Sequence, residues 1–301
     1  MSETEQGPPP PDVDETGIAE IADGVWVIPD RRVPLVPNIG IVEGEEAVLV
    51  VDTAMGPRNG ERVLAAAKAK AGGRPLIVTT THFHPEHGFG AQVFSSEAQI
   101  VYNRAQHDEL HDKGQAYVEM FRTFGPNVAA ALEGVELVEP HETYEGDRHE
   151  LDLGGRTVQL LTWGLAHTRG DQVVLLPDEG ILFTGDLVEE RFFAIYPYFP
   201  PDDADVDGRA WIEVLRRLEE LQPRIVVPGH GAVGDAGLIT TARTYHELLR
   251  DETARLAAEG LDAEETVARL EPQVLERYPG WEQPEWIGFG VRSFHAAGAP
   301  D

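Results

Sequence analysis

The segment at residues 80–88 constrains this chain more than any other, because it places three histidines and a carboxylate within six residues. These side chains are His82, His84, Glu86 and His87. The segment directly follows the apolar run at residues 75–79, which has the composition of a strand. Side chains two apart on extended backbone project to one side, so His82 and His84 can share one ion. A proline bends the chain before the other two donors, which predicts a second ion.

The composition limits both the partners and the ligands of such a site. Among 301 residues, 53 acidic and 24 basic side chains give a net charge of −29. This charge repels phosphate backbones and anionic lipid surfaces, so we expect a small-molecule substrate, no nucleic acid and no membrane partner. The acidic composition fits either a high-salt cytoplasm or a compositional bias of the source genome. Because there is no cysteine, metal ligands must be nitrogen or oxygen atoms.

The first residues of the sequence lack the basic start and the apolar segment that are typical of a secretory signal. No run approaches membrane-spanning length either, so a cytoplasmic location is predicted. Residues 1–17 are rich in proline and acidic side chains, which predicts a disordered tail.

Beyond the tail, residues 18–235 should form the main domain. Short β-rich runs up to residue 52 predict an antiparallel meander, and a second group of strands is expected between residues 136 and 184. Residues 236–301 are expected to form a helical extension packed on the same domain, because no linker rich in glycine or serine precedes them.

Three further β-rich runs end in a potential metal ligand beside glycine or small residues. These ligands are His167, Asp186 and His230. Ligands at the carboxyl ends of several strands converge on one edge of a sheet, where glycine lets the backbone approach closely. Taken singly, each position is also typical of a turn, a helix cap or a surface histidine. Together with residues 80–88 they predict one shared site.

The motifs Thr-His-x-His-x-acid-His, Gly-x-x-His-Thr, Phe-Thr-Gly-Asp and Pro-Gly-His-Gly, in this order, resemble those of the metallo-β-lactamase superfamily. The resemblance covers roughly residues 18–233. It implies an α/β (α+β) fold of the αβ/βα four-layer sandwich type, with a dinuclear metal centre at one edge. It also implies a first ion on His82, His84 and His167, a second on Glu86, His87 and His230, and Asp186 bridging both. Asp52 resembles the family's aspartate that supports the site from behind the ligands.

Glu86 departs from the family pattern, which usually has aspartate at this position. The extra methylene moves the carboxylate outward by about one carbon–carbon bond. Because metal sites tolerate only small errors in distance, Glu86 either weakens the second site or is free to act as a general base. The number of bound ions therefore depends on this residue.

The predicted reaction is the hydrolysis of an ester, thioester, lactone or amide bond of a small molecule. Two Zn²⁺ ions are expected, although iron or manganese fits the same donors. A bound metal lowers the pKa of water from about 15.7 toward about 7, so a bridging hydroxide oriented by Asp186 or Glu86 would be the nucleophile. The alternative, also from the resemblance, is a sulfur dioxygenase with a single iron. A homodimer is left open.

Several aromatic and histidine residues have two interpretations each. Residues 191–201 hold five aromatic rings within eight positions, which predicts either a pocket wall or local packing. Residues 103–124 predict either a lid over the site or an ordinary solvated helix. Trp281 and Trp286 cover the same side or pack between helices. His107 and His111 are four residues apart on a predicted helix, but without a third ligand they are expected to be solvated.

Overall fold

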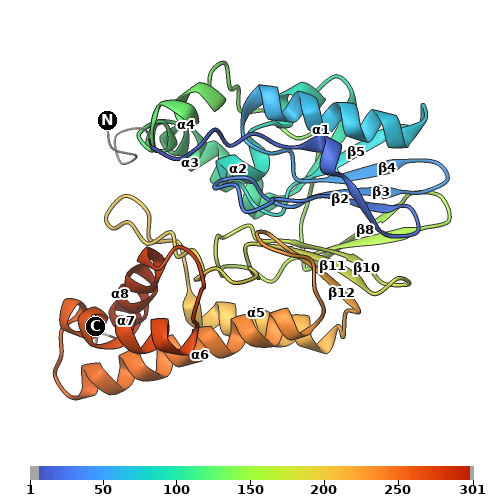
Figure 1. Ribbon diagram of the computed structural model, residues 1–301. Coiled ribbons are helices and arrows are strands. Elements are labelled where there is room, and N and C mark those ends of the chain that lie inside the picture. Colours follow the sequence, from blue (N-terminus) through green and yellow to red (C-terminus); the bar gives the residue numbers. More distant parts are fainter. Residues whose placement is uncertain (1–6, 299–301) are drawn as a thin grey trace.

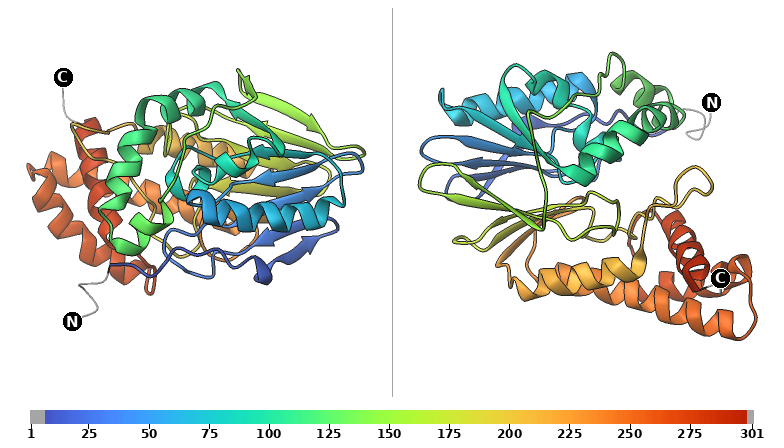
Figure 2. Two further views of the ribbon diagram at one scale, coloured as in Figure 1. Left: turned by 90° about the horizontal axis from the view of Figure 1, so that it is seen from above. Right: turned by 180° about the vertical axis from the view of Figure 1, so that it is seen from behind.

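The computed structural model describes residues 7–298 and contains two β-sheets packed face to face (Figures 1 and 2). The first sheet has the strand order β1 to β7. Strands β1 to β4 pair antiparallel, which confirms the predicted meander, and β4 to β7 pair parallel. Its strands are β1 (Ala19–Ala22), β2 (Val25–Ile28), β3 (Ile39–Glu43), β4 (Val48–Val51), β5 (Leu76–Thr79), β6 (Ala98–Asn103) and β7 (Glu142–Tyr144).

The second sheet has the order β12-β11-β10-β9-β8. All neighbours in it are antiparallel except β11 and β12. Its strands are β8 (Arg148–Asp152), β9 (Thr157–Leu161), β10 (Val173–Leu176), β11 (Ile181–Gly185) and β12 (Ile225–Pro228). The predicted second group of strands is wrong at its start. Residues 136–138 form no strand, and β7 joins the first sheet because the intervening helices allow a parallel return beside β6.

Helices cover both outer faces and complete the four layers (Figure 1). Helix α1 packs on the first sheet, while α5 and α6 pack on the second. The stripe on α5 explains its position, because Trp211, Leu215 and Leu218 recur at helical spacing and are fully buried. The helices are α1 (Gly56–Ala71), α2 (Pro85–Gly88), α3 (Arg104–Arg122), α4 (Pro126–Ala131), α5 (Gly208–Glu220), α6 (Gly237–Ala258), α7 (Ala263–Arg277) and α8 (Glu285–Gly298), with short 3₁₀ turns at Glu15–Gly17 and Ala91–Phe94.

The N-terminal segment corrects the expected disorder over residues 7–17. Asn59 of α1 accepts a hydrogen bond from the Val13 amide at 3.0 Å and donates one to the Pro11 carbonyl at 2.8 Å. Val13 is 2% exposed and packs in the core beneath α1. The charge and proline content pointed to disorder, but one buried valine and a polar side chain on α1 hold the segment in place. Residues 1–6 lie outside the described residues.

The C-terminal helices α6, α7 and α8 pack in the same hydrophobic cluster as the second sheet and α5. Leu249 of α6 and Val291 of α8 are fully buried in it, together with Leu182 of β11. Residues 299–301 lie outside the described part. Within that part, no helix has both the length and the apolar composition needed to cross a membrane.

Candidate metal centre

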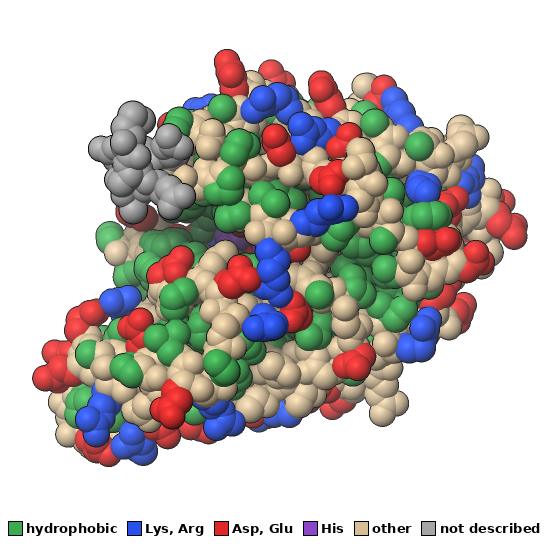
Figure 3. Space-filling view, in the orientation of Figure 1, with side chains coloured by type: hydrophobic (Ala, Val, Ile, Leu, Met, Phe, Trp, Pro, Cys, Tyr) green, Lys and Arg blue, Asp and Glu red, His purple; other side chains and the backbone are tan. Residues whose placement is uncertain are grey.

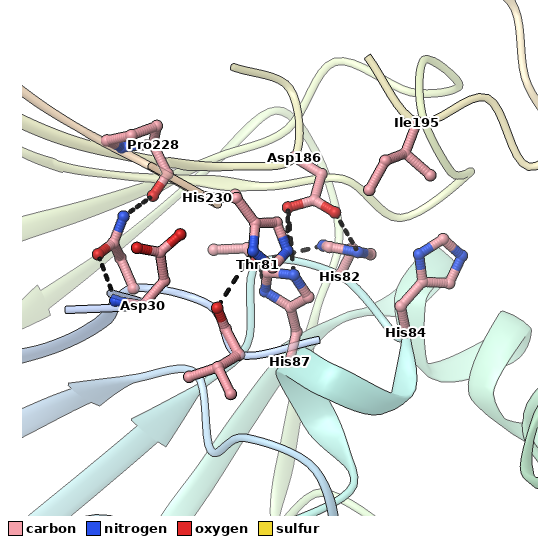
Figure 4. A network of polar contacts seen from close by, with 12 residues as sticks. Asp30, Thr81, His82, His84, His87, Asp186, Ile195, Pro228 and His230 are labelled. Carbon is pink, nitrogen blue, oxygen red and sulfur yellow. Dashed lines mark hydrogen bonds and ion pairs between the residues drawn. The ribbon is translucent and has the colours of Figure 1, made fainter. Parts of the chain in front are cut away.

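The predicted ligands meet at one edge of the two sheets, and Figure 4 shows five of them, His82, His84, His87, Asp186 and His230. Strand β5 ends at Thr79, and the loop after it carries His82 and His84. Pro85 then starts the short helix α2, which turns Glu86 and His87 away from the strand direction. The remaining ligands follow the second sheet: His167 lies between β9 and β10, Asp186 directly after β11, and His230 shortly after β12. Loops from both sheets therefore build the site.

Two groups of donor atoms form within this edge. The first is His82, His84, His167 and Asp186, and the second is Glu86, His87, His230 and Asp186. In each group the donor atoms lie within 4.8 Å of one another and every residue is buried. The His84 Nδ1 and His167 Nε2 atoms are 3.1 Å apart. Two nitrogens that share a tetrahedral Zn²⁺ ion are separated by about 3.3 Å, so this spacing fits a common ion.

Asp186 lies at the centre of both groups. Its Oδ1 atom is 3.1 Å from His87 Nε2 and 3.8 Å from His230 Nε2, and its Oδ2 atom is 3.8 Å from the Nε2 atoms of His82 and His167. His82 Nε2 and Glu86 Oε2 are buried and have no hydrogen-bond partner in the described part of the chain. Buried polar atoms without a protein partner are costly unless a ligand satisfies them. The donors therefore fit divalent metal ions.

Three of the histidine rings are fixed from behind. His167 Nδ1 donates to the Ile195 carbonyl at 2.9 Å and His230 Nδ1 donates to the Val36 carbonyl at 3.1 Å. The Nδ1 atom of His82 lies 3.1 Å from the Thr81 hydroxyl. Such contacts set the tautomer and the ring direction, which leaves Nε2 to face the shared centre.

The fourth ring, His87, is held by Asp52, as the resemblance implies. The Asp52 Oδ2 atom lies 2.9 Å from His87 Nδ1, and the Thr81 amide donates to Oδ1 at 2.7 Å. Asp52 is 1% exposed and has a φ of 68°, a left-handed backbone conformation that aspartate tolerates better than most residues. The Asp52 carboxylate therefore positions His87 and also the loop that carries His82 and His84.

Burial dominates the electrostatics of the site. It lowers the pKa of His82 and His84 well below the usual value, and the neighbouring histidines add to this effect. Burial raises the pKa of Glu86 to about 7, with a further contribution from Asp186. Burial opposes protonation of His87, but Asp186 and Asp52 outweigh it and raise the pKa of that ring. Neutral imidazoles with free nitrogens are the form that binds metal ions.

An apolar pocket opens beside the two groups. Figure 3 shows histidine atoms at the bottom of a hollow lined by hydrophobic side chains. The cavity has a volume of about 70 Å³ and continues outward into open solvent. It is lined by Leu35, His84, Glu86, Tyr117, Met120, Phe121, Phe124, Ile195, Pro197, Phe199, His230, Gln283 and Trp286. One ligand of the first group and two of the second thus face it.

The pocket walls resolve the open interpretations of the aromatic residues. Helix α3 forms one wall with Tyr117 and Phe121, and Phe124 lines the pocket just after the end of the helix. The loop at residues 191–201 is divided, because Phe199 lines the pocket while Phe193 is fully buried in the core. Trp286 also lines the pocket, whereas Trp281 packs between the C-terminal helices, with its ring 4.5 Å from that of Tyr278. His107 and His111 belong to neither donor group.

Sequence reasoning missed a buried histidine behind the site. His246 of α6 has no exposed surface, and its Nδ1 atom hydrogen-bonds the Tyr196 hydroxyl. Its ring lies 4.3 Å from that of Trp211, which in turn lies 5.4 Å from the His167 ring. Burial lowers the pKa of His246 to about 3, so the ring is neutral. A lone histidine on a helix gives no local signal of this placement.

Glu189 was also missed. It lies three residues after Asp186 and is 7% exposed. Within residues 7–298, neither of its carboxylate oxygens accepts a hydrogen bond. Burial raises its pKa well above the usual value, and the nearby Asp186 adds to this shift. Both effects favour the neutral form of this carboxyl group.

Known proteins resemble this chain in sequence and in fold. A family model described as the metallo-beta-lactamase superfamily matches residues 32–230. The chain belongs to the metallo-β-lactamase superfamily. Among solved structures of the same fold, a metallo-β-lactamase from Pontibacter korlensis aligns with a TM-score of 0.60 at 20% identity, over 76% of this chain and 98% of that one. The DIM-1 metallo-β-lactamase aligns with a TM-score of 0.61 at 19% identity, over 79% and 98%. The predicted four-layer fold is confirmed.

Two curated relatives have more specific names. Human acyl-coenzyme A thioesterase MBLAC2 is 28% identical over 249 residues, which are 75% of this chain and 85% of that protein. The alpha subunit of 2,4-dinitroanisole O-demethylase from Nocardioides sp. is 26% identical over 208 residues, 68% of this chain and 55% of that protein. Family and relatives together identify this superfamily member as a metal-dependent hydrolase.

Proposed function

We propose that this chain hydrolyses a carboxylic ester or thioester whose acyl group is apolar, with two divalent metal ions held by the two donor groups. The observation that carries the proposal is the apolar pocket directly beside both groups, because its hydrophobic lining suits an acyl chain. The named activities of the relatives differ in the bond that is broken, and the thioesterase is the one whose substrate matches this pocket. Lactones and amides are attacked at the same kind of carbonyl carbon.

Zinc is the proposed ion in both positions, since the donors are imidazoles and carboxylates without a thiolate. Bound divalent ions lower the pKa of water to near neutrality and polarise a carbonyl oxygen. His82, His84 and His167 would hold one ion, Glu86, His87 and His230 the other, and Asp186 both. We thus assign Glu86 to the second group, despite its longer side chain.

The remaining residues would position and enclose the reaction. Asp52 would keep His87 directed at the second ion through the contact at Nδ1. The Tyr117 ring stacks on His84, with centroids 5.1 Å apart, and would hold that ligand against the pocket wall. Phe121 and Trp286 would exclude water from the acyl group, so that the attacking water reaches the carbonyl only from the side of the metals.

The test combines metal analysis with substrate turnover on the purified protein. We expect two zinc ions per chain and hydrolysis of p-nitrophenyl and thioester substrates with medium-length acyl groups. His82→Ala and Asp186→Ala should abolish hydrolysis while circular dichroism shows a folded protein. His111→Ala is the matched control, because this histidine is exposed and outside both donor groups. Unchanged turnover in either site variant would refute the mechanism.

The same preparation tests the iron-dependent alternative. A single iron per chain, with oxygen uptake and no ester hydrolysis, would favour a sulfur dioxygenase. Each donor group offers four side chains, Asp186 being shared by both, which supports two ions rather than one.

A further inference from the structure

Trp211, in the first turn of helix α5, lies behind the metal centre and contacts the loops of two candidate ligands. Its side chain is fully buried, and its indole Nε1 atom donates a hydrogen bond to the Leu187 carbonyl at 3.0 Å. Leu187 directly follows Asp186 in the chain. The Trp211 ring also packs against the His167 ring, with the two ring centroids 5.4 Å apart. One side chain therefore touches both His167 and the residue next to Asp186.

The backbone of the same helical turn makes a second contact with these loops. The Asp207 amide, at the N-cap of α5, donates to the Ala166 carbonyl at 2.9 Å, and Ala166 directly precedes His167. The Trp211 amide donates in turn to the Asp207 carbonyl at 2.8 Å. A continuous set of hydrogen bonds thus runs from the residue before His167, through one turn of α5, to the residue after Asp186.

We propose that Trp211 is a positioning residue that fixes His167 and Asp186 relative to each other and thereby sets the affinity for the ion of the first donor group. The two ligands belong to different loops, one between β9 and β10 and the other after β11, so their separation depends on how the loops are held together. A metal site requires ligand distances within about 0.2 Å of their usual values. A rigid helical turn that contacts both loops supplies this precision. The inference rests on the metal binding in the proposed function and goes beyond it, because Trp211 belongs to neither donor group.

Trp211 is itself held by aromatic neighbours. Its ring lies 4.3 Å from the His246 ring and 5.2 Å from the Tyr196 ring, and these two residues are hydrogen-bonded to each other. All three side chains are fully buried. Because protein interiors are close-packed, the Trp211 ring cannot turn without displacing its neighbours. Its contacts with the two loops are therefore fixed in direction.

The second donor group shares Asp186 with the first, but its own ligands have other supports. His87, for example, is held by the Asp52 carboxylate at 2.9 Å. A displacement of the α5 turn would therefore move both His167 and Asp186 at the first ion, but only Asp186 at the second. Loss of the Trp211 contacts should weaken the first ion more than the second.

The variant Trp211→Phe tests this difference, because it removes the indole N–H and keeps an aromatic ring beside His167. Titration of the zinc-loaded protein with a competing chelator measures the affinity for each ion. The variants His84→Ala and His230→Ala assign the two affinities, since each removes a donor from one group alone. In Trp211→Phe we expect the affinity for the first ion to fall about tenfold, and that for the second by about threefold or less.

Two further proteins separate the hydrogen bond from a general loss of packing. Trp26→Phe is the matched control, because the Trp26 indole also donates a hydrogen bond, to Glu43 at 2.8 Å, and both residues lie outside the donor groups. This control should leave both affinities unchanged. Benzothienylalanine in place of Trp211 keeps nearly the same ring volume and has a sulfur atom instead of the N–H. It should lower the affinity for the first ion about three- to tenfold, even if Trp211→Phe does not fold.

The results distinguish a failure of this inference from a failure of the proposed function. If the Trp211 replacements leave both affinities unchanged, or weaken the two ions equally, the inference is overturned and the metal-dependent hydrolase stands. An equal loss of the first ion in Trp26→Phe also overturns it, because the effect would then not depend on contact with the ligand loops. A wild-type protein that binds no zinc refutes the proposed metal centre and the inference with it.

Discussion

The replacement Asp52→Asn tests how far the affinity for the second ion depends on a residue that binds no metal. Asp52 contacts His87 Nδ1 at 2.9 Å and accepts the Thr81 amide hydrogen at 2.7 Å. Asparagine has nearly the same size and tolerates the φ of 68° at this position, so the backbone should stay as it is. The variant therefore removes the negative charge and little else.

The expected magnitude follows from the strength of that contact. A hydrogen bond to a charged group contributes about 1.5–3 kcal/mol. Since about 1.4 kcal/mol corresponds to a factor of ten, affinity for the ion on His87 should fall about 10- to 100-fold. The first donor group does not contact Asp52 through its ligand nitrogens, so its ion should be lost much less readily.

A titration with a competing chelator measures both affinities in one experiment, and a thermal melt reports stability alongside. Asp112→Asn is the control, because this aspartate is exposed and pairs with the exposed His111. If Asp52→Asn weakened both ions equally, or neither, the argument that Asp52 acts through His87 would fail.

Three further predictions address the pocket, the buried histidine and the acidic ligand. Trp286→Ala should raise KM for hexanoyl esters about tenfold with a smaller effect on acetyl esters, as steady-state kinetics would show, because it removes a wall of the acyl pocket. Tyr196→Phe leaves the buried Nδ1 atom of His246 without its partner and should lower the free energy of unfolding by about 1–3 kcal/mol in a denaturant titration. The pKa of Glu86 is raised to about 7, so a proton competes with the second ion below that pH. Its measured affinity should fall as pH decreases from 8 to 6, and Glu86→Gln should remove this part of the dependence.

The convergence of the candidate ligands was predictable because their signal is local. Each one stands at the end of an apolar run, and the carboxyl ends of neighbouring strands must meet at one edge. Glu86 shows the limit of that reasoning. Its residue type alone left open whether it joins the second group, and only the position of α2 relative to Asp186 brings its carboxylate within reach of the other donors.

The parts that sequence reasoning missed depend on contacts between distant segments. Val13 was assigned to a disordered tail because its neighbours are proline and acidic residues, yet Asn59, 46 positions later, holds its amide. Residues 142–144 were grouped with the later strands, but they form β7 and pair with β6, which depends on the path of α3 and α4. Periodicity within a segment carries no information about either partner.

The helical extension after residue 235 carries none of the candidate ligands, but it contributes to the site. His246 in the extension hydrogen-bonds Tyr196, and the carbonyl of the preceding residue, Ile195, is the group that orients His167. The backbone of Glu282 pairs on both sides with the loop after Asp186, through the Arg191 carbonyl and the Phe193 amide. The extension therefore supports a ligand, fixes the loop that forms the pocket wall and supplies part of that wall. Changes in it should alter metal binding and acyl specificity as well as stability.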